Sequence, residues 1–204
     1  MDMIKNIVFD IGGVLVDFAP DKTMRKLGMP EHLIKPLMDA TIFSGLWPEL
    51  DRGFIPEDVI VNCMKEDHPE LAPMIQRFFD EGKSDLVTSF PYSAGWLSDL
   101  KDRGYGVYLL TNYPKSFFDI HWGSKFTFTP HVDGKIVSAE VKKNKPDPAI
   151  YQCLLDTYGL KAGECVFIDD RKDNVLAAQY MGMGGIRMTN YEDTRAALEE
   201  LLRR

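Results

Sequence analysis

Short apolar segments alternate with stretches of helical periodicity along most of the chain. Near-continuous apolar runs such as "CVFI" are typical of strands that are buried on both faces of a parallel sheet. The pattern predicts four strands, at Ile4–Phe9, Gly106–Leu110, Cys165–Ile168 and Gly185–Met188. It also predicts three helices, at Tyr92–Arg103, Ala149–Tyr158 and Val175–Met181, with Gly159 and Gly182 as C-terminal stops. The alternation indicates an α/β fold with a doubly wound parallel sheet.

One helical stretch is too long to be a simple crossover between two strands. From Phe18 to about Ser89 the sequence is helical in character, and it is broken by "GMPEH", "GLWPELDRGFIPED" and "EDHPELAP". We interpret this stretch as a small helical subdomain inserted after the first strand. The alternative is a set of extra helices that pack flat on the sheet.

Composition narrows the classes of function. With 204 residues, 45% of them hydrophobic, the chain is long enough for one domain with a modest insertion. Its net charge of −7 argues against broad binding of nucleic acid or of an anionic membrane, which requires a basic surface. No apolar run approaches the roughly 18 residues of a membrane span, and the N-terminus does not resemble a signal peptide. Three widely spaced cysteines without a CxxC pair are typical of reduced thiols, so we expect a cytoplasmic protein.

Polar side chains follow the predicted strands at one edge of the sheet. They are Asp10 after the first strand, Thr111 and Asn112 after "YGVYLL", Lys145 in "KKNKPDPAIY", and Asp169, Asp170, Asp173 and Asn174 after "CVFI". Each has an ordinary explanation when taken alone, as a turn residue, a strand end or a helix cap. Asp147, for example, is predicted to cap a helix that begins at Pro148. In an open parallel sheet, however, ligands bind beyond the carboxyl ends of the strands. The polar residues from Asp10 to Asn174 converge at that edge.

The residue types at this edge indicate phosphoryl chemistry. Carboxylates this close together would raise one another's pKa unless a cation lay among them. Oxygen ligands without histidine or cysteine favour Mg²⁺ over zinc. A lysine and a hydroxyl group facing that metal would bind the phosphoryl oxygens, and Asp10 would attack the phosphorus to form an aspartyl-phosphate. Gly12 and Gly13 would let backbone N–H groups approach the anion closely.

Four motifs resemble those of the haloacid dehalogenase-like (HAD) hydrolases, in the order found in that family. They are "FDIGGVLVD", "LLTN", "KPDPAIY" and "FIDDRKDN", and the resemblance extends over nearly the whole chain. It implies a Rossmann-like catalytic core at residues 1–16 and 89–204 and a helical cap at residues 17–88. The cap turn "LDRGFIPED" resembles the loop that members of the family lower onto their substrate. Arg52, Phe54 and Trp47 are therefore candidates for specificity, or else a solvated arginine and core aromatics of the cap.

The resemblance also implies which residues handle the phosphoryl group. Asp10 is the nucleophile. Thr111 and Asn112 bind the phosphoryl group, and Lys145 neutralises both that group and Asp10. Replacing Lys145 with alanine is expected to remove most of the activity with little loss of stability.

A metal site follows from the same resemblance. Asp10 and Asp170 are the carboxylate ligands of Mg²⁺, Asp169 supports the metal directly or through water, and Asn174 orients the acidic loop. Gly12 can offer only its backbone carbonyl to the metal, because it stands where most phosphatases of the family carry a second aspartate that serves as general acid. Without that acid, we expect the rate to depend steeply on the acidity of the leaving group.

The sequence thus predicts a Mg²⁺-dependent phosphomonoesterase that acts on a small phosphorylated metabolite. Its first motif looks most like that of the branch with a DLGN-type motif, which resembles sugar-1-phosphate phosphatases, so a sugar phosphate is the expected substrate. A haloacid- or phosphonate-cleaving hydrolase of the same superfamily is one alternative, and a phosphate-binding module without catalytic activity is another. The oligomeric state stays open.

Overall fold

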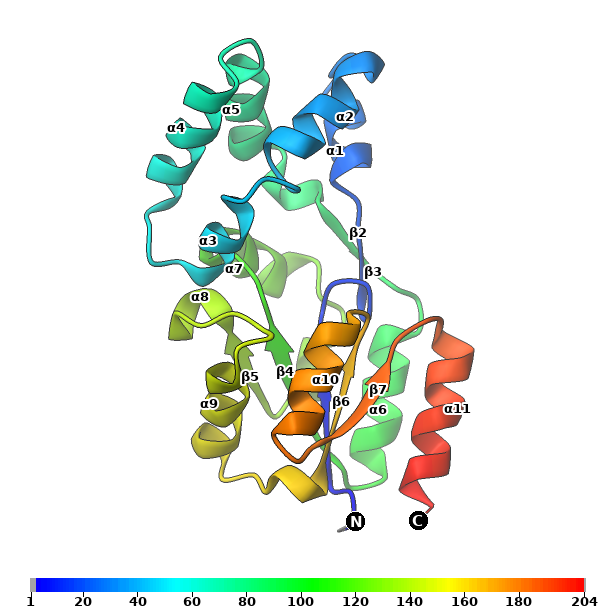
Figure 1. The fold of residues 1–204 in the computed structure, drawn as a ribbon. Coiled ribbons are helices and arrows are strands. Elements are labelled where there is room, and N and C mark those ends of the chain that lie inside the picture. The colour runs from blue at the N-terminus through cyan, green and yellow to red at the C-terminus, as the bar shows by residue number, and fades with distance from the viewer. Residues whose placement is uncertain (1–2, 204) are drawn as a thin grey trace.

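Five parallel strands form the central sheet of the structure, a computed structural model that describes residues 3–203 (Figure 1). The strands are β1 (Asn6–Phe9), β4 (Gly106–Thr111), β5 (Gly134–Val137), β6 (Cys165–Asp169) and β7 (Gly184–Arg187). Their order across the sheet is β5-β4-β1-β6-β7, so β1 lies in the middle. Phe9 lies beside Leu109 of β4 and Ile168 of β6, which brings the carboxyl ends of these three strands close together. The four predicted strands are confirmed, whereas β5 was not predicted.

Helices cover both faces of the sheet because successive apolar side chains of β1 point to opposite sides. Phe9 packs with Trp96 and Leu198 in one apolar cluster, and Val8 packs with Tyr151 in the other. One face is covered by α6 (Ser93–Asp102) and α11 (Tyr191–Leu202), and the other by α9 (Pro148–Tyr158) and α10 (Lys172–Tyr180). The predicted α/β fold is therefore confirmed, and the three predicted helices correspond to α6, α9 and α10.

Four further elements complete the described part of the chain outside the insertion. They are α7 (Lys115–Ser124), α8 (Ser138–Val141) and 3₁₀ turns at Thr129–His131 and Ala162–Glu164. Within residues 3–203, no helix combines the length and the apolar character needed to cross a membrane.

The start of α9 is fixed by local sequence chemistry. Asp147 Oδ1 accepts a hydrogen bond of 2.9 Å from the Ala149 N–H, and Pro148 occupies the first turn. The helix ends at Gly159, whose φ of 62° is left-handed. Both ends agree with the sequence prediction. The N-terminal cap also fixes where the chain just before the helix lies, and that segment carries Lys145.

Residues between the two strands of a small second sheet form a separate group of helices. β2 (Val16–Phe18) pairs antiparallel with β3 (Val87–Ser89), so the chain leaves and returns at neighbouring points. Between them lie α1 (Pro20–Lys26), α2 (Glu31–Ala40), α3 (Trp47–Arg52), α4 (Glu57–Asp67), α5 (Ala72–Glu81) and a 3₁₀ turn at Lys83–Asp85. Figure 1 shows these helices beyond the carboxyl ends of the central strands, with α3 nearest to them. The exact division of the chain stays a prediction, and we call residues 17–88 the cap.

Candidate active site

Three carboxylates gather at the carboxyl ends of β1 and β6. Asp10 directly follows β1, and its N–H continues the ladder to β6 by donating to the Ile168 carbonyl at 2.9 Å. Asp169 is the last residue of β6, and Asp170 follows it. Oxygen atoms of Asp10, Asp169 and Asp170 lie within 4.8 Å of one another. The central position of β1 therefore brings together carboxylates that are about 160 residues apart in the sequence.

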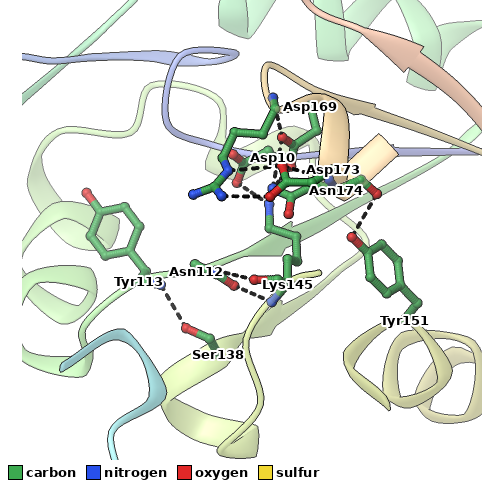
Figure 2. Close-up of polar contacts among 10 residues, drawn as sticks. Asp10, Asn112, Tyr113, Ser138, Lys145, Tyr151, Asp169, Asp173 and Asn174 are labelled. Atoms are coloured by element: carbon green, nitrogen blue, oxygen red, sulfur yellow. Dashed lines mark hydrogen bonds and ion pairs between the residues drawn. The ribbon is translucent and has the colours of Figure 1, made fainter. Parts of the chain in front are cut away.

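The ammonium group of Lys145 lies between two of these carboxylates (Figure 2). Its Nζ is 2.8 Å from Asp10 Oδ1 and 2.7 Å from Asp169 Oδ2, and the side chain is only 1% exposed. Burial alone would lower the pKa of Lys145, but the two carboxylates outweigh that effect and raise it above its usual value. Lys145 is therefore a fixed positive charge inside the site.

The side chain of Asn112 holds the backbone of Lys145. Asn112 Nδ2 donates to the Lys145 carbonyl at 3.0 Å, and the Lys145 N–H donates to Asn112 Oδ1 at 2.8 Å. Both functional groups of the amide are occupied by these bonds (Figure 2). In this structure, Asn112 thus orients Lys145 rather than presenting its amide to a ligand.

Asp169 is held by a second set of donors. Its Oδ1 accepts a hydrogen bond of 2.8 Å from the Arg171 N–H, and Asn174 Nδ2 lies 3.0 Å from both of its oxygens. Asn174 therefore orients the acidic loop, which is the role that the resemblance implied for it. The Arg171 guanidinium forms its ion pair with Asp173, with 2.7 Å between Nη2 and Oδ2, rather than with the carboxylate cluster.

The charge balance of the cluster fits a divalent cation. Three carboxylates and one ammonium group leave two negative charges uncompensated. Burial raises the pKa of Asp10 to about 6 against the opposing effect of Lys145, and burial together with Asp169 raises the pKa of Asp170. Carboxylate oxygens without histidine or cysteine are the donors that Mg²⁺ prefers. The residues present thus fit the metal that the sequence predicts.

The two glycines after Asp10 differ in what they tolerate. Gly13 has a φ of +68°, and a Cβ there would lie 2.9 Å from Asp170 Oδ2, so only glycine fits. Its N–H donates to the Val16 carbonyl at 2.9 Å and is therefore not free for an anion, contrary to the sequence interpretation. Gly12 has no positive φ, and no atom lies within 4 Å of a Cβ built on it. A side chain at Gly12 would therefore meet open space.

A cavity of about 360 Å³ opens above the carboxylates, between them and the cap. One wall is aromatic, because the Trp47 ring lies 6.3 Å from Phe18 and 5.8 Å from Phe117 between ring centroids. The remaining apolar lining residues are Val16, Leu86, Val87 and Pro114. The polar and glycine lining residues are Asp10, Gly12, Gly13, Asp17, Asp51, Asn112, Tyr113, His121 and Asp170.

Other predicted site residues lie outside this cavity. Thr111 is buried at the end of β4 and is not among the lining residues. Arg52 is turned toward Glu49, with 2.8 Å between the charged groups, and does not line the cavity. Phe54 is 67% exposed. Of the three cap residues singled out in the sequence, only Trp47 lines the cavity.

Asp51 is a charged cap residue of α3 that the sequence reasoning missed. It lines the cavity, and burial together with the negative charge of Asp10 raises its pKa to about 7. The turn "LDRGFIPED" directed attention to this stretch, but no sequence motif distinguished Asp51 from the neighbouring Arg52. Only the orientation of α3 distinguishes these two neighbours.

Known proteins resemble this chain in sequence and in fold. The family model described as haloacid dehalogenase-like hydrolase matches residues 4–182. A sesquiterpene phosphatase from Aspergillus oryzae is 27% identical, over 97% of this chain and 96% of its own length. A D-ribitol-5-phosphate phosphatase from Bacteroides thetaiotaomicron is 26% identical, over 98% of this chain and 99% of its own length. Two longer relatives match over only 37% and 38% of their length.

A solved structure shares the fold. A HAD family enzyme from Bacteroides thetaiotaomicron, in complex with magnesium, superposes with a TM-score of 0.75 and 23% identity. The match covers 97% of this chain and 99% of that chain.

Proposed function

The chain belongs to the haloacid dehalogenase-like hydrolases, and on this premise we propose that it is a Mg²⁺-dependent phosphomonoesterase. The observation that carries the proposal is the buried ion-pair cluster, in which Lys145 bridges Asp10 and Asp169 beside a third carboxylate. A buried lysine in contact with two carboxylates is costly to build for stability alone. The same arrangement supplies a nucleophile, a cation for phosphoryl oxygens and a place for a divalent metal.

Each residue of the cluster then has a role in phosphoryl transfer. Asp10 attacks the phosphorus of the bound ester, the ester P–O bond breaks, and an aspartyl-phosphate forms on Asp10. Lys145 holds Asp10 in one orientation and stabilises the negative charge on the transferred group. Asn112 keeps Lys145 in place through its backbone. Water then hydrolyses the aspartyl-phosphate, which releases phosphate and regenerates the Asp10 carboxylate.

Mg²⁺ would be held by Asp10 and Asp170, with Asp169 and the Gly12 carbonyl as further candidate donors. When bound, it would neutralise the charge of the carboxylates and of the phosphoryl oxygens. Thr111 stays a candidate for contact with the phosphoryl group, although it does not line the cavity.

The organic part of the substrate is more open, because two of the relatives are phosphatases named for organic groups of opposite polarity. One is named for a sesquiterpene and the other for ribitol 5-phosphate. A sugar phosphate was the expectation from the sequence. The cavity walls favour an apolar or aromatic group instead, since Phe18, Trp47 and Phe117 form one side.

Few polar groups of the cavity are free to bind sugar hydroxyls. Asp17 pairs with Lys22 at 2.9 Å. The Tyr113 hydroxyl is 2.6 Å from His121 Nδ1, and His121 Nε2 is 2.6 Å from the Lys83 carbonyl. A polyol would therefore leave many of its hydrogen bonds unmade, which is costly in an enclosed site. We infer a preference for phosphate esters of apolar alcohols.

Release of inorganic phosphate from a panel of monoesters tests the proposed function. The panel contains an isoprenyl phosphate, an aryl phosphate, ribitol 5-phosphate and glucose 1-phosphate, each assayed with Mg²⁺ and with excess chelator. Metal-dependent release, together with acid-stable phosphate on Asp10 in a quenched reaction, supports the proposal. Binding of phosphate without turnover supports the non-catalytic alternative. A haloacid and a phosphonate are assayed beside the panel, and turnover of either one without phosphomonoester turnover supports the haloacid- or phosphonate-cleaving alternative.

Substitution of the aromatic wall tests the preference for apolar esters. Trp47→Ala should lower kcat/KM for the isoprenyl phosphate at least about tenfold, because the lost apolar contact is worth roughly 1.5–3 kcal/mol. It should change kcat/KM for ribitol 5-phosphate much less. Phe43→Leu is the control, because Phe43 is an exposed cap aromatic outside the cavity. Equal losses for both esters would contradict the preference.

A further inference from the structure

The first half of the proposed reaction needs a proton donor, and Gly12 offers none. The ester oxygen becomes an alkoxide when its bond to phosphorus breaks, unless a positioned acid protonates it. We propose that Asp51 of the cap is this general acid and that it then serves as the general base for water in the second half-reaction. This inference rests on the proposed phosphomonoesterase activity.

Position singles out Asp51 among the carboxylates of the cavity. The aspartates that line the cavity are Asp10, Asp17, Asp51 and Asp170, whereas the buried Asp169 does not line it. Asp10 is the nucleophile, Asp170 belongs to the metal cluster, and Asp17 is paired with Lys22. Within residues 3–203, the Asp51 carboxylate receives no hydrogen bond and forms no ion pair. It is therefore the lining carboxylate that remains free to exchange a proton with a ligand.

The two other side chains of the cavity that could donate a proton, Tyr113 and His121, are hydrogen-bonded to each other. Tyr113 and His121 share a hydrogen bond of 2.6 Å, and His121 is also bonded to the Lys83 carbonyl. Burial raises the pKa of Tyr113 far above its usual value and lowers the pKa of His121. The tyrosine is thus a poor acid, and the histidine is neutral at ordinary pH.

The end of α3 that carries Asp51 is tied to the catalytic core. The Ser138 hydroxyl donates to the Asp51 carbonyl at 2.6 Å and accepts a hydrogen bond of 2.8 Å from the Tyr113 N–H. Figure 2 shows this link between Ser138 and Tyr113, next to the Asn112–Lys145 pair. The backbone of Asp51 is therefore connected through one serine to the chain directly after β4.

Two further bonds hold α3 on both sides of Asp51. Asn144 Nδ2 donates to the Pro48 carbonyl at 2.7 Å, and Lys142 Nζ donates to the Gly53 carbonyl. Both donors lie in the segment that leads directly to Lys145. The same stretch of chain thus orients the cation of the site and the helix that carries the proposed acid, so their relative positions are coupled.

The environment of Asp51 suits proton transfer near neutral pH. Burial and the charge of Asp10 raise its pKa to about 7, while Lys145 and Arg171 act in the opposite direction. Tyr113 also faces it and is uncharged. A general acid is most effective when its pKa lies near the working pH. A carboxyl group whose pKa lies near the working pH can both donate and accept a proton.

The proton balance of both half-reactions closes. In the first, Asp10 forms a bond to phosphorus and the ester bond breaks. The electron pair of that bond goes to the ester oxygen, which takes the Asp51 proton and leaves as an alcohol. In the second, the Asp51 carboxylate takes a proton from water as the water oxygen bonds to phosphorus, and the electrons of the P–O bond return to Asp10. Asp51 is protonated again when phosphate leaves.

Kinetics of Asp51→Asn on esters of graded leaving-group acidity test the assignment. With an alkyl phosphate, whose leaving group needs the proton, kcat/KM should fall by about 10²–10⁴-fold, the usual contribution of general acid catalysis. With a dinitrophenyl phosphate it should fall less than tenfold. The dependence on leaving-group pKa should therefore be steep in the variant and shallow in the wild type, in contrast to the steep wild-type dependence expected from the sequence. Loss of the base should also produce a burst of dinitrophenol followed by slow steady-state turnover, with phosphate trapped on Asp10.

Controls separate this inference from the function on which it rests. Asp39→Asn removes an exposed cap carboxylate on α2 that pairs with Lys35, and it should leave both rates unchanged. Circular dichroism and melting verify the fold of Asp51→Asn. Asp51→Ala serves as a second variant, for which we expect the same slope of log kcat/KM against leaving-group pKa. Equal slopes in wild type and both variants, without a burst, would overturn the role of Asp51. Absence of phosphomonoester turnover in the wild type would instead overturn the proposed function.

Discussion

Replacing Lys145 with methionine tests whether the site is held together by one buried charge. Methionine approximates the length of the lysine stem and can pack against Phe167, whose ring centroid lies 5.2 Å from Lys145 Nζ. The substitution therefore removes the charge and keeps most of the packing. What remains is a pair of buried carboxylates, Asp10 and Asp169, without their common counter-ion.

The expected loss of stability is large because the lysine is enclosed. Removing one partner of a buried ion pair typically costs about 3–5 kcal/mol. For a chain of this size, 1 kcal/mol corresponds to about 2–4 °C in Tm, so Tm should fall by roughly 6–20 °C. The sequence had suggested that alanine at Lys145 would cost little stability. We now expect otherwise, since the side chain is 1% exposed and contacts two carboxylates.

Thermal melting followed by circular dichroism, with Mg²⁺ or with chelator, measures this effect. Mg²⁺ should raise the Tm of the variant more than that of the wild type, because it supplies the missing positive charge. At a concentration of 100 Kd, binding adds about 2.7 kcal/mol. The variant should also lose about 10²–10³-fold in kcat through the missing phosphoryl contact.

Lys135→Met is the matched control for the Lys145 substitution. Lys135 also has a carboxylate partner, Glu140, and an aromatic partner, Phe118, but its side chain is 28% exposed. Its pair is worth about 0.2–1 kcal/mol, or at most about 4 °C. A Lys145 variant that melts no lower than this control, or that gains nothing from Mg²⁺, would refute the electrostatic reasoning.

Three further predictions concern the acidic cluster and its glycine turn. Asp10→Asn should abolish turnover in a folded protein, and retention of more than about a tenth of the wild-type rate would exclude covalent catalysis. Asp170→Ala should weaken the Mg²⁺-dependent rise in Tm more than Asp173→Ala does, because only Asp170 belongs to the carboxylate cluster. Gly13→Ala should destabilise the protein by roughly 1–3 kcal/mol, as measured by urea unfolding, whereas Gly12→Ala should cost under about 1 kcal/mol. Equal costs at the two glycines would show that the backbone at Gly13 is not strained by a side chain.

The sequence predicted the central part of the fold because its signals are local. A buried run such as Cys165–Ile168 identifies a strand by itself, and a carboxylate directly after it must lie at the strand's end. The fold class therefore placed Asp10 and Asp169 at the same edge of the sheet, whereas the structure shows that their strands are neighbours. The strand at Gly134–Val137 was missed because four residues that begin with glycine and lysine carry almost no apolar pattern.

The parts of the site that were not predicted depend on how cap and core pack together. Arg52 and Asp51 are adjacent in the sequence, and no periodicity indicates which of them faces Asp10. That choice is made by contacts between distant segments, such as the bond from Ser138 to the Asp51 carbonyl. The occupation of the Asn112 amide by Lys145 is likewise a tertiary contact over 33 residues. Motifs identify which residues meet, but not which of their atoms are already engaged.

The contrast between Gly12 and Asp51 explains why the acid can lie on the cap. Open space at Gly12 means that packing does not exclude an aspartate there. A carboxylate at that position would, however, add negative charge to a cluster in which Asp10 and Asp170 already have raised pKa values. Asp51 on α3 instead lines the cavity from the cap, where burial and the charge of Asp10 raise its pKa to about 7. Proton transfer then requires α3 to be docked on Ser138, so the departure of the alcohol is confined to the arrangement of cap and core in which the cavity is formed.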